Sequence, residues 1–348
     1  MKRIKAALGI VACTVGGGAA AQTNVTAMGL VDMYAGASQF SGVADKTKVV
    51  GSGGLTTSWF GFKGSEELGG GLRAEFALTG FFRGDTGSSG RFNGDNLFSR
   101  DANVGLAGSF GKVQVGRGLA PNFLPTVLFN PFGDSFTFSP LVVHADMSGS
   151  AAWGGAANAA DTGWSNQVIY SSPKVGGVSV NLHYQFGEVA GQTSTNNVGA
   201  NLLYFSGPLG LTAFYHDTNL SNPNPAVTPN KQKAAFVGAS YDFKVLKLAA
   251  TFQRNDNESA ATGARTSLDR TASVGAWVPA GAGGSVLAAY ARTKRDLATV
   301  PDLTRRTFSL GYDYALSKRT DVYAVAMNDK LSGYDDATSY GVGIRHRY

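Results

Sequence analysis

The chain has 348 residues, a formal net charge of +6, 43% hydrophobic residues and a mean hydropathy of −0.06. After residue 21 no stretch approaches the ~20 consecutive apolar residues of a membrane-spanning helix, so a helical membrane protein is excluded. A membrane β-barrel is not excluded, because its strands expose only every second residue to lipid.

Residues 1–21 have the pattern of a signal peptide, with a basic start, an apolar core and the small residues Ala19–Ala21 at the expected cleavage site. We therefore expect the mature chain to begin at Gln22. Removing the three leader cations from the 30 Lys and Arg leaves 27 against 24 acidic residues, a surplus too small to indicate binding to nucleic acid. The one cysteine, Cys13, lies in the leader, so the mature protein would have neither disulfides nor thiolate chemistry. The residues before Cys13 loosely fit a lipoprotein cleavage box, and lipidation is the alternative for this leader.

From Asn24 onward, short segments alternate apolar and polar residues, which is the pattern of β-strands with two different faces. The period of two is clearest in Gly71–Phe81, where it holds over eight residues. Sixteen such segments are predicted: Asn24–Ser38, Ser58–Gly64, Gly71–Phe81, Arg100–Gly108, Lys112–Gly118, Ser165–Ser171, Gly177–Phe186, Asn197–Phe205, Leu211–Asp217, Lys233–Phe243, Lys247–Asn255, Arg270–Val278, Ser285–Lys294, Arg306–Leu316, Asp321–Asn328 and Thr338–Tyr348.

The connections between these segments alternate between short turns rich in Gly, Pro and Lys and long loops rich in Asp, Asn, Ser, Thr and Gly. A soluble β-sandwich has no reason to place all its short turns at one end, whereas an outer-membrane barrel has short periplasmic turns and long outer loops. The pattern predicts an all-β fold, a 16-stranded antiparallel transmembrane β-barrel over residues 22–348 without a domain boundary. A barrel of this size encloses a lumen too wide for side chains to fill, so its polar face would line water. A soluble barrel or sandwich is the alternative.

The longest connection, Leu119–Gly163, has no regular pattern, and loops of this length in compact domains are usually functional or disordered. It is too rich in Phe, Leu and Val for a solvated linker. Its charged residues Asp134, Asp146 and Asp161 are acidic, and it contains neither Lys nor Arg. We expect it to fold into the lumen and narrow the barrel; the alternative is a flap on the barrel rim.

The segment Phe60–Leu72 closely resembles the second hairpin of Gram-negative general porins, especially the neisserial and betaproteobacterial group. Other motifs of that family occur in order along the mature chain: Val104–Leu106, Phe110–Val113, Gly116–Arg117, Leu316–Thr320 and Gly341–Tyr348. The resemblance implies a homotrimeric outer-membrane channel for passive diffusion of ions and small hydrophilic solutes, surrounded by outer-membrane lipid and lipopolysaccharide. It also implies that the C-terminal strand, which ends at Tyr348, is presented to the outer-membrane assembly machinery.

In that family, wall arginines face an acidic third loop and form the pore constriction. The resemblance places Arg100 on the wall and Asp134 on the loop. Trp59 and Gly163 stand where the family leads us to expect further arginines, so the basic cluster is thinned. Trp59 could stack against a loop aromatic or a substrate ring, or could pack beneath the inner loop.

Other charged residues on the predicted polar face complete the candidate constriction. Lys63, Arg73 and Arg292 could replace the missing cations from lumen-facing positions, and Glu75 lies on the same face as Arg73. The opposed charges of such a neck would create a transverse field that orients dipolar solutes.

An enzyme is the first competing function, since outer-membrane barrels can carry a nucleophile and a base. The four histidines lack an obvious partner set, and the sequence has no Gly-x-Ser-x-Gly elbow, metal-ligand cluster or phosphate loop. We therefore expect no catalysis and no cofactor. A substrate-specific channel for a sugar or organic anion, and a mainly structural or adhesive barrel, are the two further alternatives.

Overall fold

The computed structural model describes residues 24–146, 160–191, 195–220, 230–298 and 301–348, so the predicted signal peptide and Cys13 lie outside the described residues. Within these ranges, sixteen long strands pair in antiparallel neighbours and form the wall of a barrel. They are β1 (Asn24–Ser38), β3 (Trp59–Gly69), β4 (Leu72–Arg83), β6 (Asp101–Gly108), β7 (Gly111–Leu119), β8 (Gly163–Ser171), β9 (Val178–Gln185), β10 (Asn197–Ser206), β11 (Leu209–Asn219), β12 (Asn230–Asp242), β13 (Lys247–Ser259), β14 (Arg265–Pro279), β15 (Gly284–Leu297), β16 (Leu303–Ala315), β17 (Thr320–Leu331) and β18 (Ala337–Arg347).

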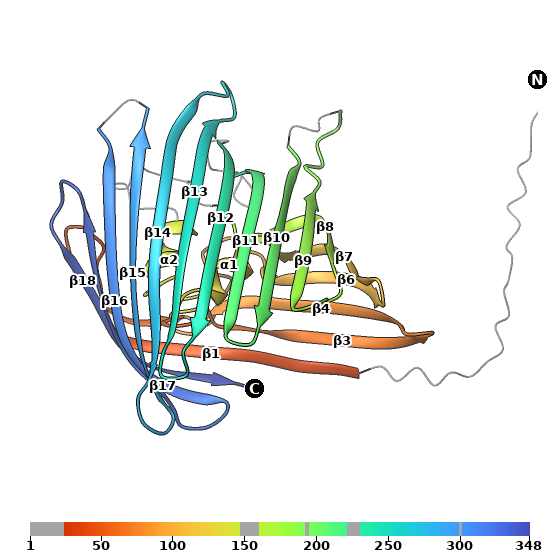
Figure 1. Ribbon diagram of the computed structural model, residues 1–348, viewed down its shortest axis with the longest axis horizontal. Coiled ribbons are helices and arrows are strands. Elements are labelled where there is room, and N and C mark those ends of the chain that lie inside the picture. Colours follow the sequence, from red (N-terminus) through yellow and green to blue (C-terminus); the bar gives the residue numbers. More distant parts are fainter. Residues whose placement is uncertain (1–23, 147–159, 192–194, 221–229, 299–300) are drawn as a thin grey trace, which may run out of the picture.

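The barrel closes through its first strand, which pairs with β3, with β18 and with a short strand, β2 (Thr47–Ser52). The first half of β1 pairs with β3, from Asn24 opposite Ser65 onward, and its second half pairs with β18. At the seam the Tyr348 N–H donates to the Gly29 carbonyl at 3.1 Å. Gly29 is required there, because a Cβ at this position would come within 2.5 Å of the Tyr348 hydroxyl. The sheet therefore has no open edge, and the predicted 16-stranded barrel is confirmed (Figure 1).

Side-chain exposure alternates along each strand, and β9 shows the pattern clearly. Leu182 and Tyr184 are 49% and 38% exposed on the outer face, whereas His183 and Gln185 are 7% and 1% exposed on the inner face. The exposed outer residues are apolar and the inner residues are polar, the reverse of a soluble barrel. Aromatic residues near strand ends add to the outer face, as the sequence predicts: Tyr184, Tyr241, Phe243, Tyr312, Tyr314, Tyr340 and Tyr348.

The strand ends differ from the predicted ones mainly on the loop side. β14 begins at Arg265, five residues before the predicted start, and β13 continues to Ser259. The outward side chains of these extensions include the charged Asp256, Glu258 and Arg265, so the run of exposed apolar residues ends while the hydrogen-bond ladder continues. Two short strands inside predicted loops, β2 (Thr47–Ser52) and β5 (Ser88–Ser89), were not predicted.

The long connection between β7 and β8 contains two short helices, so the prediction of no regular structure there is wrong. α1 (Phe123–Leu128) lies against β10, β11 and β12, and α2 (Pro140–Ala145) lies against β14, β15 and β16. In Figure 1 both helices lie level with the strands, between the two ends of the barrel. No described helix is long and apolar enough to cross a membrane.

Candidate pore constriction

The described part of the third long loop, residues 120–146 and 160–162, is tied to the wall by hydroxyl and amide hydrogen bonds. Ser135 Oγ donates to the Gly54 carbonyl at 2.6 Å, and Ser309 Oγ of β16 donates to the Phe138 carbonyl at 2.7 Å. On another side of the barrel, Asn201 Nδ2 of β10 donates to the Pro121 carbonyl at 3.0 Å. These wall residues belong to the inner face, so this segment lies across the inside of the wall.

Helix α2 is held to the same face by the imidazole of His144. Its two ring nitrogens lie 2.7 Å from the hydroxyls of Thr293 and Thr307. Burial, followed by the nearby guanidinium groups of Arg305 and Arg295, lowers the pKa of His144 well below its ordinary value. The ring is therefore neutral at physiological pH, and it serves as a hydrogen-bond bridge rather than as a cation of the pore.

Apolar packing supports the loop beside these polar anchors. Phe132 and Phe138 of the loop join a buried cluster with Tyr34, Leu55 and Met327 of the wall. The rings of Tyr34 and Phe138 meet edge-to-face, with centroids 5.5 Å apart. The loop backbone is thus fixed on both sides of Asp134, which lies between the two helices.

The positive side of the candidate neck is Arg100, which directly precedes β6. Its guanidinium carbon lies 4.1 Å from the centroid of the Trp59 ring, a cation–π contact. Its Nη1 is 2.9 Å from Asp101 Oδ2. One face of the Trp59 ring is therefore covered by the guanidinium of Arg100.

The acidic side is Asp134 on the loop. Removal from water raises the pKa of its carboxyl to about 6, while a hydrogen bond from Thr56 and the charges of Arg100 and Arg345 act in the opposite direction. Arg345 Nη1 donates to Thr56 Oγ1 at 2.8 Å, so the Thr56 hydroxyl joins the wall cation to the loop acid. Asp134 is thus under the influence of two guanidinium groups.

Arg345 was not predicted as a site residue, although its position could have been read from the sequence. It follows Gly341 and Gly343 at a spacing of two on the last strand, and these residues face inward. Its guanidinium also lies 2.9 Å from Asp321 and 3.3 Å from Asp313. Each arginine of the neck therefore has an acidic partner on the wall.

The other two loop acids lie away from this neck. Asp161 binds Arg91 at 2.6 Å and Arg117 at 3.2 Å. Burial raises the pKa of Asp146 to about 7, and its carboxylate accepts a hydrogen bond from Asn122 at 3.0 Å. Asp134 is therefore the loop acid that faces the wall cations.

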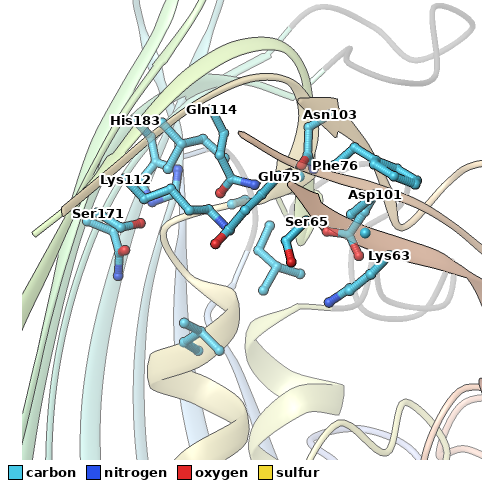
Figure 2. Close-up of a pocket in the computed structure, with 18 of the residues that line it drawn as sticks. Lys63, Ser65, Glu75, Phe76, Asp101, Asn103, Lys112, Gln114, Ser171 and His183 are labelled. Atoms are coloured by element: carbon cyan, nitrogen blue, oxygen red, sulfur yellow. Dashed lines mark hydrogen bonds and ion pairs between the residues drawn. The ribbon is translucent and has the colours of Figure 1, made fainter. Parts of the chain in front are cut away.

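The predicted residues Lys63, Arg73 and Glu75 lie together nearer the short turns. Glu75 contacts Lys112 at 3.0 Å and Arg73 at 3.4 Å. Lys63 and Glu75 line a cavity of about 420 Å³, together with Asp101 and Lys112, and Figure 2 shows these side chains around a common space. Within the described chain Lys63 has no ion-pair partner. We call this cavity the vestibule; Asp101, which lines it, is also the ion-pair partner of Arg100.

Comparison with known proteins decides what this barrel is. Residues 6–334 match the family model described as Gram-negative porin. The chain belongs to the Gram-negative porin family. It is 30% identical over 356 residues to outer membrane porin protein 32 of Delftia acidovorans, covering 100% of this chain and 94% of the relative. It is 29% identical over 390 residues to an outer membrane porin protein of Bordetella pertussis, covering 95% of this chain and 96% of the relative.

Solved structures agree with this assignment. The anion-selective porin from Comamonas acidovorans superposes with a TM-score of 0.76 at 25% identity, covering 94% of this chain and 100% of that one. The trimeric form of OmpT from Vibrio cholerae gives 0.68 at 15% identity, covering 94% and 99%, which shows the shared fold. This porin is an outer-membrane β-barrel whose channel allows passive diffusion, and the family and its relatives' names indicate a channel rather than an enzyme.

One expectation about the wall of this porin needs correction, and one glycine gains a structural explanation. Arg292 does not face the lumen: it is exposed on the outer face of β15, two residues from the outward Tyr290. At the position of Gly163, a Cβ would lie 3.1 Å from Arg117 Nη2, so the guanidinium of Arg117 fills the space beside this glycine. Arg117 is 6% exposed and bound to Asp161, and it belongs to a buried network.

Proposed function

We propose that ions and small hydrophilic solutes cross this porin through a neck between Asp134 on the loop and Arg100 and Arg345 on the wall. The observation that carries the proposal is the position of Thr56, whose hydroxyl accepts a hydrogen bond from Arg345 Nη1 at 2.8 Å and whose side chain also hydrogen-bonds Asp134. Opposite charges on facing sides of a narrow aqueous passage produce a transverse field, and low-dielectric walls focus it. This field would orient dipolar solutes and bias the passage of ions.

The expected ion preference is weak and favours anions. Arg100 has Asp101 as a partner and Arg345 has Asp321, so neither guanidinium acts as an isolated charge. Trp59 and Gly163 add no cation to the neck. The similar Comamonas structure is described as anion-selective, which supports the direction of the preference.

Planar-bilayer recording tests this proposal. The refolded protein should conduct, and its reversal potential in a salt gradient should show a small anion preference. Absence of conductance would favour a mainly structural or adhesive barrel instead. Strong selectivity would indicate that the vestibule cations Lys63 and Lys112, rather than the charges of the neck, determine which ions pass.

The vestibule favours a second candidate function, a substrate-specific channel for an organic anion or sugar. Lys63 has no ion-pair partner in the described chain and lines the same cavity as Lys112, so an anionic solute would find one free ammonium group there. Saturable block of the conductance by such a solute, lost in Lys63→Gln, would support this function. A block that rises linearly with solute concentration would support general diffusion.

We also infer the partners of the channel. A homotrimer is supported by the trimeric form of the similar OmpT structure, and chemical crosslinking of the refolded protein tests it. Outer-membrane lipid and lipopolysaccharide would surround the apolar outer face. The exposed Tyr348 at the end of β18 would be presented to the outer-membrane assembly machinery. Residues 1–21 would be removed, which N-terminal sequencing of the mature protein tests.

A further inference from the structure

The tip of the third long loop rests on the inner wall through the ring of Pro131. A Cβ placed on Gly275 of β14 would lie 2.3 Å from Pro131 Cδ and 3.0 Å from Pro131 Cγ. The next nearest atom is the nitrogen of Pro131, so the three closest atoms all belong to the loop and none to the wall. The proline ring therefore occupies the volume that a side chain at residue 275 would need. We call this contact the proline seat.

The conformation of β14 does not itself require a glycine at this position. The backbone of Gly275 has no positive φ, so an alanine could adopt it without strain. Directly opposite Gly275 on the two neighbouring strands lie Ala249 and Ala289, so the wall carries only small side chains on either side of the ring. The contact with Pro131 is thus what leaves no room for a side chain at Gly275.

The next loop residue has a similar contact two strands away. A Cβ on Gly311 of β16 would lie 3.1 Å from Phe132 Cε1. Beside these two contacts a cavity of about 360 Å³ lies between the loop and wall residues that include Lys247, Trp277 and Leu287. The loop is therefore not packed on the wall along its whole length, and individual ring contacts determine its distance from the wall.

A rigid turn connects the proline seat to Asp134. The side-chain amide of Asn130 makes four hydrogen bonds of 2.7 to 2.9 Å within the loop, donating to the carbonyls of Thr126 and Gly133 and accepting from the Phe132 N–H and the Ser139 hydroxyl. Asn130 is 4% exposed, so water does not compete for these bonds. Pro131 lies within this turn and Asp134 follows the turn directly. A displacement of the ring therefore also moves the carboxylate.

We propose that the absence of a side chain at Gly275 sets the distance of the loop tip from the wall, and with it the width of the neck beside Asp134. Gly275 is a positioning residue, because it acts through Pro131 and not by contact with the solute. The inference rests on the proposed neck and adds a residue that determines its width. The ring cannot rotate away from a methyl group, because Cδ is bonded to the loop backbone. Since carbon atoms pack at about 3.5 Å, the ring would have to move by about 1 Å into the lumen.

Gly275→Ala in the refolded full-length porin tests this inference in planar bilayers. The single-channel conductance should fall, because the displaced tip narrows the neck. For the same reason, smaller polyethylene glycols than before should be excluded from the channel. Gly311→Ala should have a weaker effect in the same direction, since a Cβ at 3.1 Å from Phe132 Cε1 requires a displacement of only a few tenths of an ångström.

The matched control is Gly238→Ala, at an inner-face glycine of β12. The three atoms nearest to a Cβ there belong to wall side chains, the closest being Thr212 Cγ2 at 3.0 Å, and none belongs to the loop. Conductance and the polymer size limit should therefore stay unchanged in this control. The decisive variant is Gly275→Ala/Pro131→Ala. Alanine at residue 131 lacks Cγ and Cδ, so the double variant should recover the conductance and the size limit of the unmodified channel.

The inference is overturned if Gly275→Ala conducts and excludes polymers as the unmodified channel does, or if the double variant stays as narrow as Gly275→Ala. If Gly275→Ala does not refold, the double variant decides. A folded double variant of normal width supports the proline seat, whereas a second failure to refold assigns Gly275 to the stability of β14 and overturns the inference. Absence of conductance in the unmodified protein would contradict the proposed channel, whereas a conducting channel that is insensitive to Gly275→Ala contradicts the proline seat alone.

Discussion

Asp32 Oδ2 accepts the backbone N–H of Thr56 at 2.8 Å, although Asp32 has no exposed surface. The same oxygen accepts the N–H of Leu55 at 2.8 Å, and Oδ1 accepts the N–H of Gly54 at 3.2 Å. The carboxylate thus fixes the backbone of Gly54 to Thr56. Thr56 contacts both Arg345 and Asp134, and the Gly54 carbonyl accepts the Ser135 hydroxyl. A buried acid of the first strand therefore positions both sides of the proposed neck.

Asp32→Asn should loosen the neck while the barrel still forms. The amide keeps the shape of the side chain but loses one acceptor oxygen, so buried backbone N–H groups lose a partner at a cost of roughly 1–3 kcal/mol. We expect a lower unfolding midpoint and noisier single-channel currents with a changed mean conductance. Asp85→Asn, in an exposed loop position, is the control and should behave like the unmodified channel. Quiet, unchanged currents in Asp32→Asn would show that the loop holds the neck without this anchor.

Neighbouring substitutions on β9 test the assignment of the two faces. Leu182→Arg places a charge on the outer face and should destabilise folding into vesicles by roughly 2–4 kcal/mol if the site lies at mid-bilayer. Asn181→Arg should be tolerated, because Asn181 lines the water-accessible vestibule. Denaturant titration of refolding in lipid vesicles measures both. Equal costs at the two positions would contradict the alternation of faces that defines the barrel.

The sequence was sufficient for the barrel because a period of two survives wherever one face meets lipid and the other meets water. The prediction of strand ends fails where the two faces of a strand do not differ in polarity. β13 continues past Asn255 and β14 begins before Arg270, and both extensions place charged side chains such as Glu258 and Arg265 where exposed apolar residues would mark a strand. α1 and α2 were missed because each is only six residues long, and the wall rather than an amphipathic pattern holds them in place.

The candidate site was predicted in part. Arg100 lies on the Trp59 ring, while the pairing of Arg100 with Asp134 across the neck stays a prediction that the resemblance supplies. Arg345 was missed, although strand parity alone places it in the lumen. Arg292 lies on the outer face because it is two residues from the outward Tyr290 on β15. Contacts between distant segments, such as Thr56 with Arg345, depend on the path of a loop, and no local pattern determines that path.

Ion preference should depend on pH through Asp134. Its pKa is raised to about 6, so the carboxylate is charged at pH 7 and becomes neutral as the pH falls below 6. Loss of this negative charge leaves the two guanidinium groups unopposed, and the reversal potential should shift towards anions between pH 7 and pH 5. Asp134→Asn should remove the shift, while Asp161→Asn, which changes a buried loop acid away from the neck, should retain it. The same raised pKa makes the free energy of unfolding depend on pH. The folded protein binds the Asp134 proton more tightly than the unfolded chain does, so this stabilisation is lost as the pH rises through about 6.

The C-terminal end of the last strand provides a test of assembly. Tyr348 is 51% exposed beyond β18, and its backbone closes the barrel seam with Gly29. Tyr348→Ala keeps the backbone hydrogen bonds, so refolding in detergent should remain close to normal. Insertion in cells should fall if the exposed ring is read by the assembly machinery. A parallel loss of refolding in vitro would assign the ring to barrel stability instead, and Tyr312→Ala serves as the control for loss of an exposed aromatic elsewhere.

Removing one charge at a time should show how each side of the neck affects ion permeability. Asp134→Asn should shift permeability towards anions at neutral pH, and Arg100→Ala should shift it towards cations, since Asp101 then lacks its partner at 2.9 Å. Arg345→Ala should act in the same direction as Arg100→Ala, with a further loss of stability because Asp321 and Asp313 lose their shared cation. Reversal potentials in a salt gradient measure all three.

Salt provides the internal check on these variants. The screening length falls from about 10 Å at 0.1 M to about 3 Å at 1 M, so a selectivity set by charges across an aqueous neck must weaken as salt rises. The differences between Asp134→Asn, Arg100→Ala and the unmodified channel should therefore shrink together. Arg292→Ala is the matched control, because it removes an arginine whose side chain lies outside the lumen. If Arg292→Ala shifted the reversal potential as far as Arg100→Ala, charge at the membrane surface rather than at the neck would set the selectivity.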